Sequence, residues 1–375
     1  MQRVRTSNLV PGMISAEDVY SYNNQLILPK GTELTDKIIT RLEFYSVLAI
    51  KVEDKMASEV GSSVDESLDG ASNETSFSSI TENLSYSEKI KATTQFKEFK
   101  KNFVENTEAL QGNLRKIVED NAPINADELL SSVSNLISES STSIGIFDML
   151  HNMRNYDDLT YVHSMSVSLI CNIFGKWLGY SEDDIRILTL AGLLHDIGKL
   201  TIPEAIIKKP GRLTDQEFNI IKTHTVQGYN ILKKQDIDER IKAAALMHHE
   251  RNDGSGYPLG YPDEKIAEFA KIVAIADVYD AMTAARVYRG PLCPFKVVAI
   301  FEAEGLQKYD SRFILTFLQH ISETYMNNRV ALSDGTVGDI VMINKNALSR
   351  PMIKTLDGQF VNLVDRTDLT IENFV

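Results

Sequence analysis

The chain has 375 residues, of which 43% are hydrophobic and 24% charged, as is usual for a soluble protein with more than one structural unit. Its formal net charge of −13 disfavours binding to polymeric nucleic acid or to an anionic membrane surface. The chain contains neither an apolar stretch long enough to span a bilayer nor an N-terminal secretory signal, and it has only two cysteines, so we expect a cytoplasmic protein with reduced thiols.

The first 55 residues predict a small mixed α/β unit of unknown role. An apolar run at 26–34 is punctuated by Pro and Gly, as strands and turns are. Residues 36–47 carry apolar side chains at helical spacing, and a strand-like run follows at 49–54. Residues 56–86 are rich in Ser, Asn, Asp and Glu and bury too little apolar surface to offset their ordering entropy. We expect them to form a linker.

Residues 87–144 predict a helical connector that begins with one long helix over 87–121. The apolar residues of this helix recur at spacings of three, four or seven: Phe96, Phe99, Phe103, Leu110, Leu114 and Ile117. Two partners fit this stripe equally well. One is a second copy of the chain, which makes 87–121 a candidate homodimer seam, and the other is the chain's own domain. Asn-Ala-Pro at 121–123 ends the helix, and Asn125 is placed to cap the next one.

The rest of the chain predicts a helical domain followed by a small β appendage. Over residues 145–328 the apolar residues recur at three and four, and Gly and Pro gather in the loops at 210–214 and 253–263. Residues 329–375 contain short β-like runs separated by turn sequences. The predicted fold class is therefore mainly α, with a small α/β unit at the N-terminus and a β appendage at the C-terminus.

Histidine is concentrated in one part of the chain. Five of the seven histidines lie in the stretch that runs from His163 to His249: His163, His195, His224, His248 and His249. Asp196 follows His195 in an apolar run that predicts burial of both side chains, and Asp277 interrupts another apolar helix. Burying imidazoles and carboxylates without partners is costly, and a metal removes that cost by coordinating them. The set therefore predicts a metal site.

The donor types predict two divalent transition-metal ions. Imidazole with carboxylate suits Fe, Mn, Zn, Co or Ni better than Ca or Mg alone. Six ligands and, in addition, one shared carboxylate are too many for one tetrahedral zinc. Two metals bridged by Asp196 and a water lower the pKa of that water and clamp phosphoryl oxygens during in-line attack. Lys199, one turn beyond Asp196, is placed to stabilise phosphate charge, and its alternative role is that of a helix C-terminal cation.

At this point the motifs resemble a known family. HDIGK at 195–199 followed by HHERNDGSGYP at 248–258 is similar to the HD-GYP phosphodiesterases, a bacterial branch of the HD metal-dependent phosphohydrolases. The pair at this separation is specific, whereas either motif alone is weak. The resemblance covers residues 145–328 and extends to the segments 158–164, 222–232 and 275–289. It implies an HD-type helical bundle whose two metals, Fe or Mn, serve to hydrolyse cyclic di-GMP to pGpG or GMP.

The resemblance also implies roles for particular residues. One metal would be held by His163, His195, Asp196 and Asp277, and the second by Asp196, His224, His248 and His249. Asp196 and Lys199 would act in catalysis. The cyclic dinucleotide would be contacted by Lys199, by Tyr257 of the GYP loop, and by Arg286 and Arg289. An arginine pairs bidentately with phosphate or guanine, although Arg286 at a helix end also fits a plain solvated position.

Three positions qualify this implied site. Leu159 stands where some family members have a Glu that helps to hold a third metal, and leucine has no donor atom, so we expect two metals. Gly290 follows Arg289 where the family often has a basic residue, which leaves recognition of the base or phosphate less defined. Asp280, one turn from Asp277, either orients a metal ligand or is a surface acid.

Three functions are consistent with these residues. The first is hydrolysis of cyclic di-GMP, and the second is hydrolysis of another cyclic dinucleotide by the same metal chemistry. The third is a receptor that binds cyclic di-GMP without turnover and signals through its flanking regions. All seven metal-ligand positions are intact, which favours an enzyme over a receptor.

Overall fold

A computed structural model of the chain describes residues 2–5, 9–10, 12–20, 26–35, 38, 49–53, 86–139, 143–153, 159–209, 211, 213–284 and 292–375. The chain falls into two compact units, and each is considered separately below. The first comprises Met1–Glu82 and Ala285–Gly290, and the second comprises Asn83–Ala284 and Pro291–Val375.

Among its described residues, the N-terminal unit contains two antiparallel strand pairs. β1 (Gln2–Arg5) pairs with β4 (Ala49–Val52), and β2 (Val19–Tyr20) pairs with β3 (Leu26–Leu28). A small apolar core forms from Leu9, Val19, Leu28, Leu34, Ile50 and Val52. The strands expected within 26–34 and 49–54 are thus confirmed. The helix predicted at 36–47 and the linker predicted at 56–86 lie, apart from Ile38 and Tyr86, outside the described residues.

The second unit begins with two helices where the sequence predicted one. α2 (Tyr86–Ala92) ends at Thr93, whose backbone is extended, and α3 (Thr94–Glu119) begins there. The hydroxyl of Thr93 accepts a hydrogen bond from the amide of Phe96 at 3.1 Å, so it caps the new helix and explains the break. Asn125 caps α4 (Ala126–Glu139) as predicted, because it accepts from the amide of Glu128 at 3.2 Å.

The apolar stripe of α3 faces the chain's own core. Its residues are all buried within the core of the second unit: Phe96, Phe99, Phe103, Leu110, Leu114 and Ile117. The chain itself therefore covers the surface that 87–121 was expected to offer as a homodimer seam. Of the two alternatives, packing on its own domain is the one observed, and the homodimer prediction loses the feature that motivated it.

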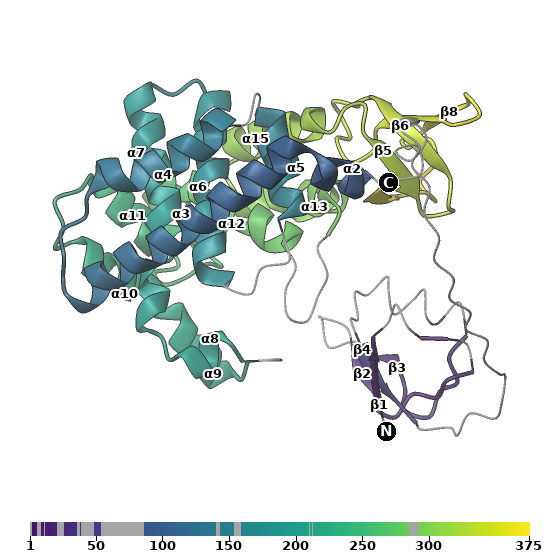
Figure 1. The fold of residues 1–375 in the computed structure, drawn as a ribbon, viewed down its shortest axis with the longest axis horizontal. Helices are drawn as coiled ribbons and strands as arrows, with labels where there is room; N and C mark the ends of the chain where they lie inside the picture. Colours follow the sequence, from purple (N-terminus) through teal and green to yellow (C-terminus); the bar gives the residue numbers. More distant parts are fainter. Residues whose placement is uncertain are drawn as a thin grey trace, which may run out of the picture. The chain divides into compact units, whose positions relative to one another are not determined.

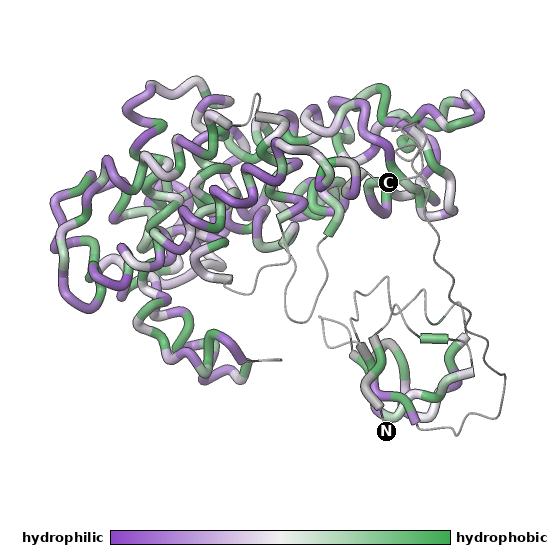
Figure 2. The backbone as a smooth tube through the Cα atoms, in the orientation of Figure 1, coloured by the Kyte–Doolittle hydropathy of each residue, from purple (hydrophilic) through white to green (hydrophobic). Residues whose placement is uncertain are grey.

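The helical bundle follows α4 and is shown in Figure 1. Its helices are α5 (Ser143–Asn152), α6 (Leu159–Trp177), α7 (Glu182–Leu194), η3 (Ile197–Thr201), α8 (Glu204–Ile207), α9 (Asp215–Lys222), α10 (His224–Leu232), α11 (Glu239–Met247), η4 (Asp263–Lys265), α12 (Glu268–Thr283), α13 (Pro294–Ile300), η5 (Phe301–Gly305), α14 (Leu306–Lys308) and α15 (Ser311–Thr324). Hydrophobic and hydrophilic residues alternate along most of these helices (Figure 2). α12, like α6, is buried on most sides, and it packs against α6, α7 and α11, as expected of a central helix.

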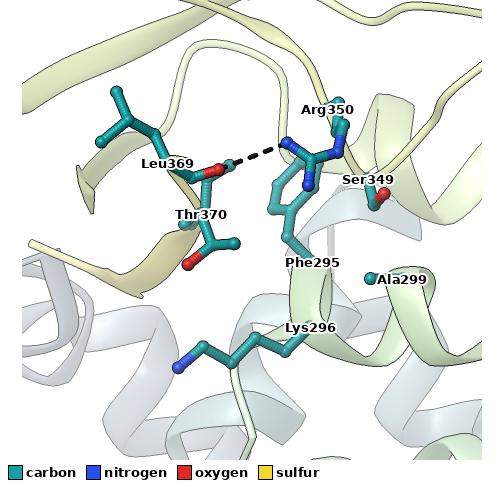
Figure 3. Close-up of a pocket in the computed structure, with 8 residues that line it drawn as sticks. Phe295, Lys296, Ala299, Ser349, Arg350, Leu369 and Thr370 are labelled. Carbon is teal, nitrogen blue, oxygen red and sulfur yellow. Dashed lines mark hydrogen bonds between the residues drawn. The ribbon is translucent and has the colours of Figure 1, made fainter. Parts of the chain in front are cut away.

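The chain ends in an antiparallel sheet of five strands with the order β8-β7-β6-β5-β9. The strands are β5 (Arg329–Leu332), β6 (Val337–Met342), β7 (Met352–Thr355), β8 (Phe360–Asn362) and β9 (Ile371–Phe374). Figure 3 shows where the sheet meets α13: Phe295 and Lys296 of α13 face Leu369 and Thr370, and Arg350 donates to the carbonyl of Leu369 at 3.3 Å. The cavity between them measures about 60 Å³.

One apolar core runs from α3 through the bundle and into the C-terminal sheet. The predicted fold class, mainly α with a small N-terminal unit and a small β appendage, is confirmed. Cys171 and Cys293 are both buried and unpaired, as expected. Among the helices that the structure describes, none combines the length and apolar character that crossing a bilayer requires.

Candidate metal centre

The HD pair lies in a turn rather than within a helix. α7 ends at Leu194, and His195 and Asp196 lead into the short helix η3. The predicted burial holds, because their exposed fractions are 0% and 1%. A β-carbon placed on Gly198 would lie 2.0 Å from the carbonyl oxygen of His224. Glycine at this position therefore allows η3 to touch α10, and this contact brings Asp196 next to His224.

Four other segments supply the remaining donors. His163 lies in α6, His224 begins α10, His248 and His249 follow α11, and Asp277 lies in the central helix α12. All of them are buried except His249, which is partly buried. The structure thus brings together all seven residues that the sequence proposes as metal ligands.

Asp196 stands between two sets of imidazoles. Its Oδ2 lies 3.3 Å from Nε2 of His195 and 3.6 Å from Nε2 of His163. Its Oδ1 lies 3.3 Å from Nε2 of His224 and 3.7 Å from Nε2 of His248. Each oxygen therefore faces a different pair of histidines, which is the arrangement that a carboxylate bridging two ions needs.

Two groups of donor atoms lie close enough to hold an ion. The first is Asp196 with His224, His248 and His249, and the second is His163 with His195 and Asp277. Within each group the donor atoms lie within 4.8 Å of one another. These groups match the two expected ligand sets, except that Asp196 falls by distance into one group only.

Backbone carbonyls hold the Nδ1 atoms of three histidines in place. Nδ1 of His195 donates to the carbonyl of Gly192 at 2.7 Å, and Nδ1 of His224 donates to the carbonyl of Ile221 at 2.6 Å. Nδ1 of His248 lies 3.1 Å from the carbonyls of Ala244 and Ala245. These bonds turn the Nε2 atoms inward and fix the tautomer, as is usual for histidines that bind metals.

Asp280 does the same for His163. Nδ1 of His163 donates to Oδ2 of Asp280 at 2.7 Å, and Asp280 is buried. Nε2 of the same ring lies 3.0 Å from Oδ1 of Asp277. Asp280 therefore orients a proposed ligand, which is the first of its two expected roles.

Burial sets the protonation of the second set of imidazoles. It lowers the pKa of His224, lowers that of His248 well below its ordinary value, and lowers that of His249 to about 3. These rings are therefore neutral at physiological pH. Neutral imidazole is the form that binds a metal.

Local charges outweigh burial at the two carboxylates and at His163. Burial raises the pKa of Asp196, but the ammonium of Lys199 and the imidazole of His195 hold it well below its ordinary value. Asp277 behaves likewise beside His163. Burial lowers the pKa of His163, yet its hydrogen bonds to the two aspartates of α12 raise it to about 9. Asp196 and Asp277 are therefore ionised although they are buried, and a bound cation would offset their negative charge.

Two buried polar atoms in this cluster lack a hydrogen-bond partner among the described residues. They are Nε2 of His195 and Oδ1 of Asp196. Leaving a buried polar atom unpaired costs about 1–3 kcal/mol, and coordination to an ion would remove that cost. Imidazole and carboxylate donors together suit divalent transition metals, so the residues present fit the metals that the sequence predicts.

The structure describes two of the four residues that are expected to contact the substrate. Lys199 of η3 lines the centre, and its ammonium contacts Oδ2 of Asp196. The ring of Tyr257 lies 4.7 Å from that of His249 and 6.4 Å from that of the exposed Phe218. Arg286 and Arg289 lie outside the described residues.

The sequence reasoning missed Glu250, which organises the GYP loop. Glu250 is buried, and its carboxylate accepts from the amides of Leu259 at 2.7 Å and Tyr261 at 3.1 Å. A β-carbon on Gly256 would lie 2.4 Å from Cα of Glu250, so the glycine lets the loop pack against this segment. The available signal was the acid that directly follows the two histidines of the motif.

The part of the chain that contains this centre is similar to known proteins. A family model for the HD domain matches residues 125–313, about half of the chain. The chain is 31% identical over 226 residues to a cyclic di-GMP phosphodiesterase of Pseudomonas aeruginosa. The aligned region covers 59% of this chain and 54% of the relative. It is 40% identical over 190 residues to a cyclic di-GMP phosphodiesterase of Thermotoga maritima, covering 49% of this chain and 52% of the relative.

A third relative has a different substrate in its name. The chain is 40% identical over 167 residues to a 3'3'-cGAMP-specific phosphodiesterase of Vibrio cholerae, covering 44% of this chain and 39% of the relative. The chain therefore spans about half or less of the length of these curated relatives. The matches confirm the family resemblance that the HD and GYP motifs predict.

Proposed function

Because the chain belongs to the HD domain family, we propose that it is a metal-dependent phosphodiesterase that hydrolyses cyclic di-GMP. The observation that carries this proposal is Asp196, whose two oxygens each face a different pair of histidine Nε2 atoms. Two of the relatives described above are named for the same activity. We assign the catalytic domain to residues 145–328.

In this proposal the seven clustered side chains hold two ions. One ion takes His163, His195, Asp196 and Asp277, and the other takes Asp196, His224, His248 and His249. Two divalent ions supply Lewis acidity toward the phosphoryl oxygens and lower the pKa of a bound water. We propose Fe or Mn as the metals. A third ion is not expected, because Leu159 at the start of α6 has no donor atom.

The remaining roles belong to residues around the ions. Lys199 carries a positive charge beside Asp196 and is placed to bind the anionic phosphodiester. Tyr257, next to His249, presents a ring on which a base can stack. Arg286 and Arg289 are proposed to donate to phosphate or guanine. The product is pGpG, GMP or both.

A second candidate substrate is 3'3'-cGAMP. It is favoured by the relative from Vibrio cholerae that is named for this compound, and it would use the same ions and the same Lys199. A receptor that binds cyclic di-GMP without turnover, the third reading, is not favoured, because the relatives described above are named as phosphodiesterases. The three readings predict different outcomes in one assay.

The test is turnover by anaerobically purified, metal-loaded protein, with metal analysis and chromatography of products. Cyclic di-GMP and 3'3'-cGAMP are supplied separately and in competition. Faster conversion of cyclic di-GMP to pGpG or GMP supports the proposal, and faster conversion of 3'3'-cGAMP supports the second candidate. Tight binding without any product would contradict both and favour the receptor.

A further inference from the structure

A pocket opens beside the metal centre, between the end of α3, the start of α6, η3 and α8. Its volume is about 250 Å³. The residues that line it include Arg115, Val118, Glu119, Tyr161, Lys199 and Ile202. Both cations and carboxylates line the pocket, so a ligand that offers acceptors and donors together fits it better than a simple anion does.

The pocket is continuous with the proposed catalytic residues. Lys199 lines it and contacts Asp196. Thr160 and Tyr161 line it from α6, within one turn of His163 on the same helix. One molecule can therefore reach both places: a group in the pocket needs only a short linkage to a group at the metal centre.

The volume limits what the pocket can hold. Sites that enclose a whole small molecule usually measure about 300–1,000 Å³, so a pocket of about 250 Å³ suits a part of a dinucleotide rather than all of it. The buried Tyr161 and the apolar side chains of Val118 and Ile202 provide the apolar surface that a flat base requires.

Two exposed, charged residues of α3 line the pocket. Arg115 and Glu119 are four positions apart, so they lie on the same face of the helix. Guanine presents acceptors at O6 and N7, which suit an arginine, and donors at N1 and N2, which suit a carboxylate. Adenine presents an amino group where guanine has O6, and it lacks the 2-amino donor. On the wall formed by α8, Glu204 is paired with Lys208 at 2.6 Å.

We propose that this pocket is a subsite for one guanine base of a dinucleotide substrate, in which Arg115 and Glu119 distinguish guanine from adenine. The inference rests on the proposed function, because it requires a dinucleotide at the metal centre. It also goes beyond the family, since Arg115 and Glu119 precede the residues 125–313 that the HD domain model matches. The helix α3 would then contribute specificity that the matched family region does not contain.

The test is equilibrium binding to the full-length, metal-loaded protein. The probes are the phosphorothioate analogues of cyclic di-GMP and cyclic di-AMP, chosen because they resist hydrolysis. Arg115→Gln and Glu119→Gln are compared with Lys116→Gln, a matched control on the same helix whose exposed side chain does not line the pocket. Metal content is measured for every variant, and hydrolysis of cyclic di-GMP by the wild-type protein is measured separately.

We expect the wild type to bind the guanine analogue more tightly than the adenine analogue. Each pocket variant should weaken binding of the guanine analogue about tenfold, the usual scale for losing a base-reading contact, and should reduce the preference for guanine. The control should match the wild type, and metal content should not change. Equal affinity of Arg115→Gln, Glu119→Gln and the control, or no guanine preference in the wild type, would overturn the subsite.

These outcomes separate the subsite from the proposed function. Hydrolysis of cyclic di-GMP together with equal affinities refutes the subsite and leaves the function standing. Affinities that depend on Arg115 without hydrolysis support the subsite and refute the function. Absence of any binding by the wild type contradicts both.

Discussion

Replacement of Asp280 by asparagine should weaken metal binding although Asp280 itself is not a proposed ligand. Asp280 is buried, and its Oδ2 accepts a hydrogen bond from Nδ1 of His163 at 2.7 Å. This bond fixes the ring so that Nε2 points toward Asp277 and Asp196. Asparagine has the same size but lacks the charge, so it disturbs the orientation and basicity of His163 with little change in packing.

The magnitude follows from the type of bond. A hydrogen bond to a charged group contributes about 1.5–3 kcal/mol, which corresponds to a factor of about 10–150 in an equilibrium constant. Loss of such a supporting residue typically costs about 10–100-fold in metal affinity. Since the amide oxygen of asparagine still accepts a hydrogen bond, we expect the lower end, about a tenfold loss.

The assay is competition for Mn²⁺ between the metal-stripped protein and a chromophoric chelator. Asp183→Asn serves as the matched control, because Asp183 is an exposed acid on α7. The control should retain wild-type affinity, while Asp280→Asn binds the metal more weakly. Equal metal affinity of the two variants would refute the orienting role of Asp280.

Further predictions concern the centre and its supports. Asp196→Ala should abolish hydrolysis of cyclic di-GMP in a folded protein, because it removes the shared ligand; retention of more than about a few per cent of activity would count against the mechanism. Gly198→Ala should destabilise the protein by about 3 kcal/mol or more in denaturant unfolding, since the added carbon would meet the carbonyl of His224, whereas Gly112→Ala, with open space in α3, should stabilise it by about 0.5–1 kcal/mol. Equal effects of the two glycine variants would contradict that explanation. Glu250→Ala should raise KM for cyclic di-GMP and increase hydrogen exchange at Leu259 and Tyr261, because both amides lose their acceptor; unchanged exchange would show that the loop is held by other contacts.

The candidate centre was accessible from sequence because its residues are chemically unusual where they occur. Histidines and acids within apolar runs, such as His195, Asp196 and Asp277, require partners, so their clustering in space followed from the cost of burial. Periodicity, by contrast, says that a face is buried but not what covers it. The stripe of α3 therefore fitted a dimer seam and an internal core equally well, and only the packing of the whole chain decided between them.

Other features depended on contacts between segments that are distant in the sequence. The role of Asp280 became clear only when α12 was placed against α6, and the role of Gly198 only when η3 was placed against α10. The break at Thr93 is a local event, but a threonine within a helical pattern does not by itself reveal whether its hydroxyl will cap a new helix. Contacts of this kind are not encoded in the spacing of residue types.

Chromatography of cyclic di-GMP incubated with the metal-loaded full-length protein tests the central claim most directly. The same preparation is analysed for metal, and Asp196→Ala is run in parallel. We predict two transition-metal ions per chain, conversion of cyclic di-GMP to pGpG or GMP by the wild type, and no conversion by the variant. Recovery of intact cyclic di-GMP from wild-type protein that carries both ions would contradict the account.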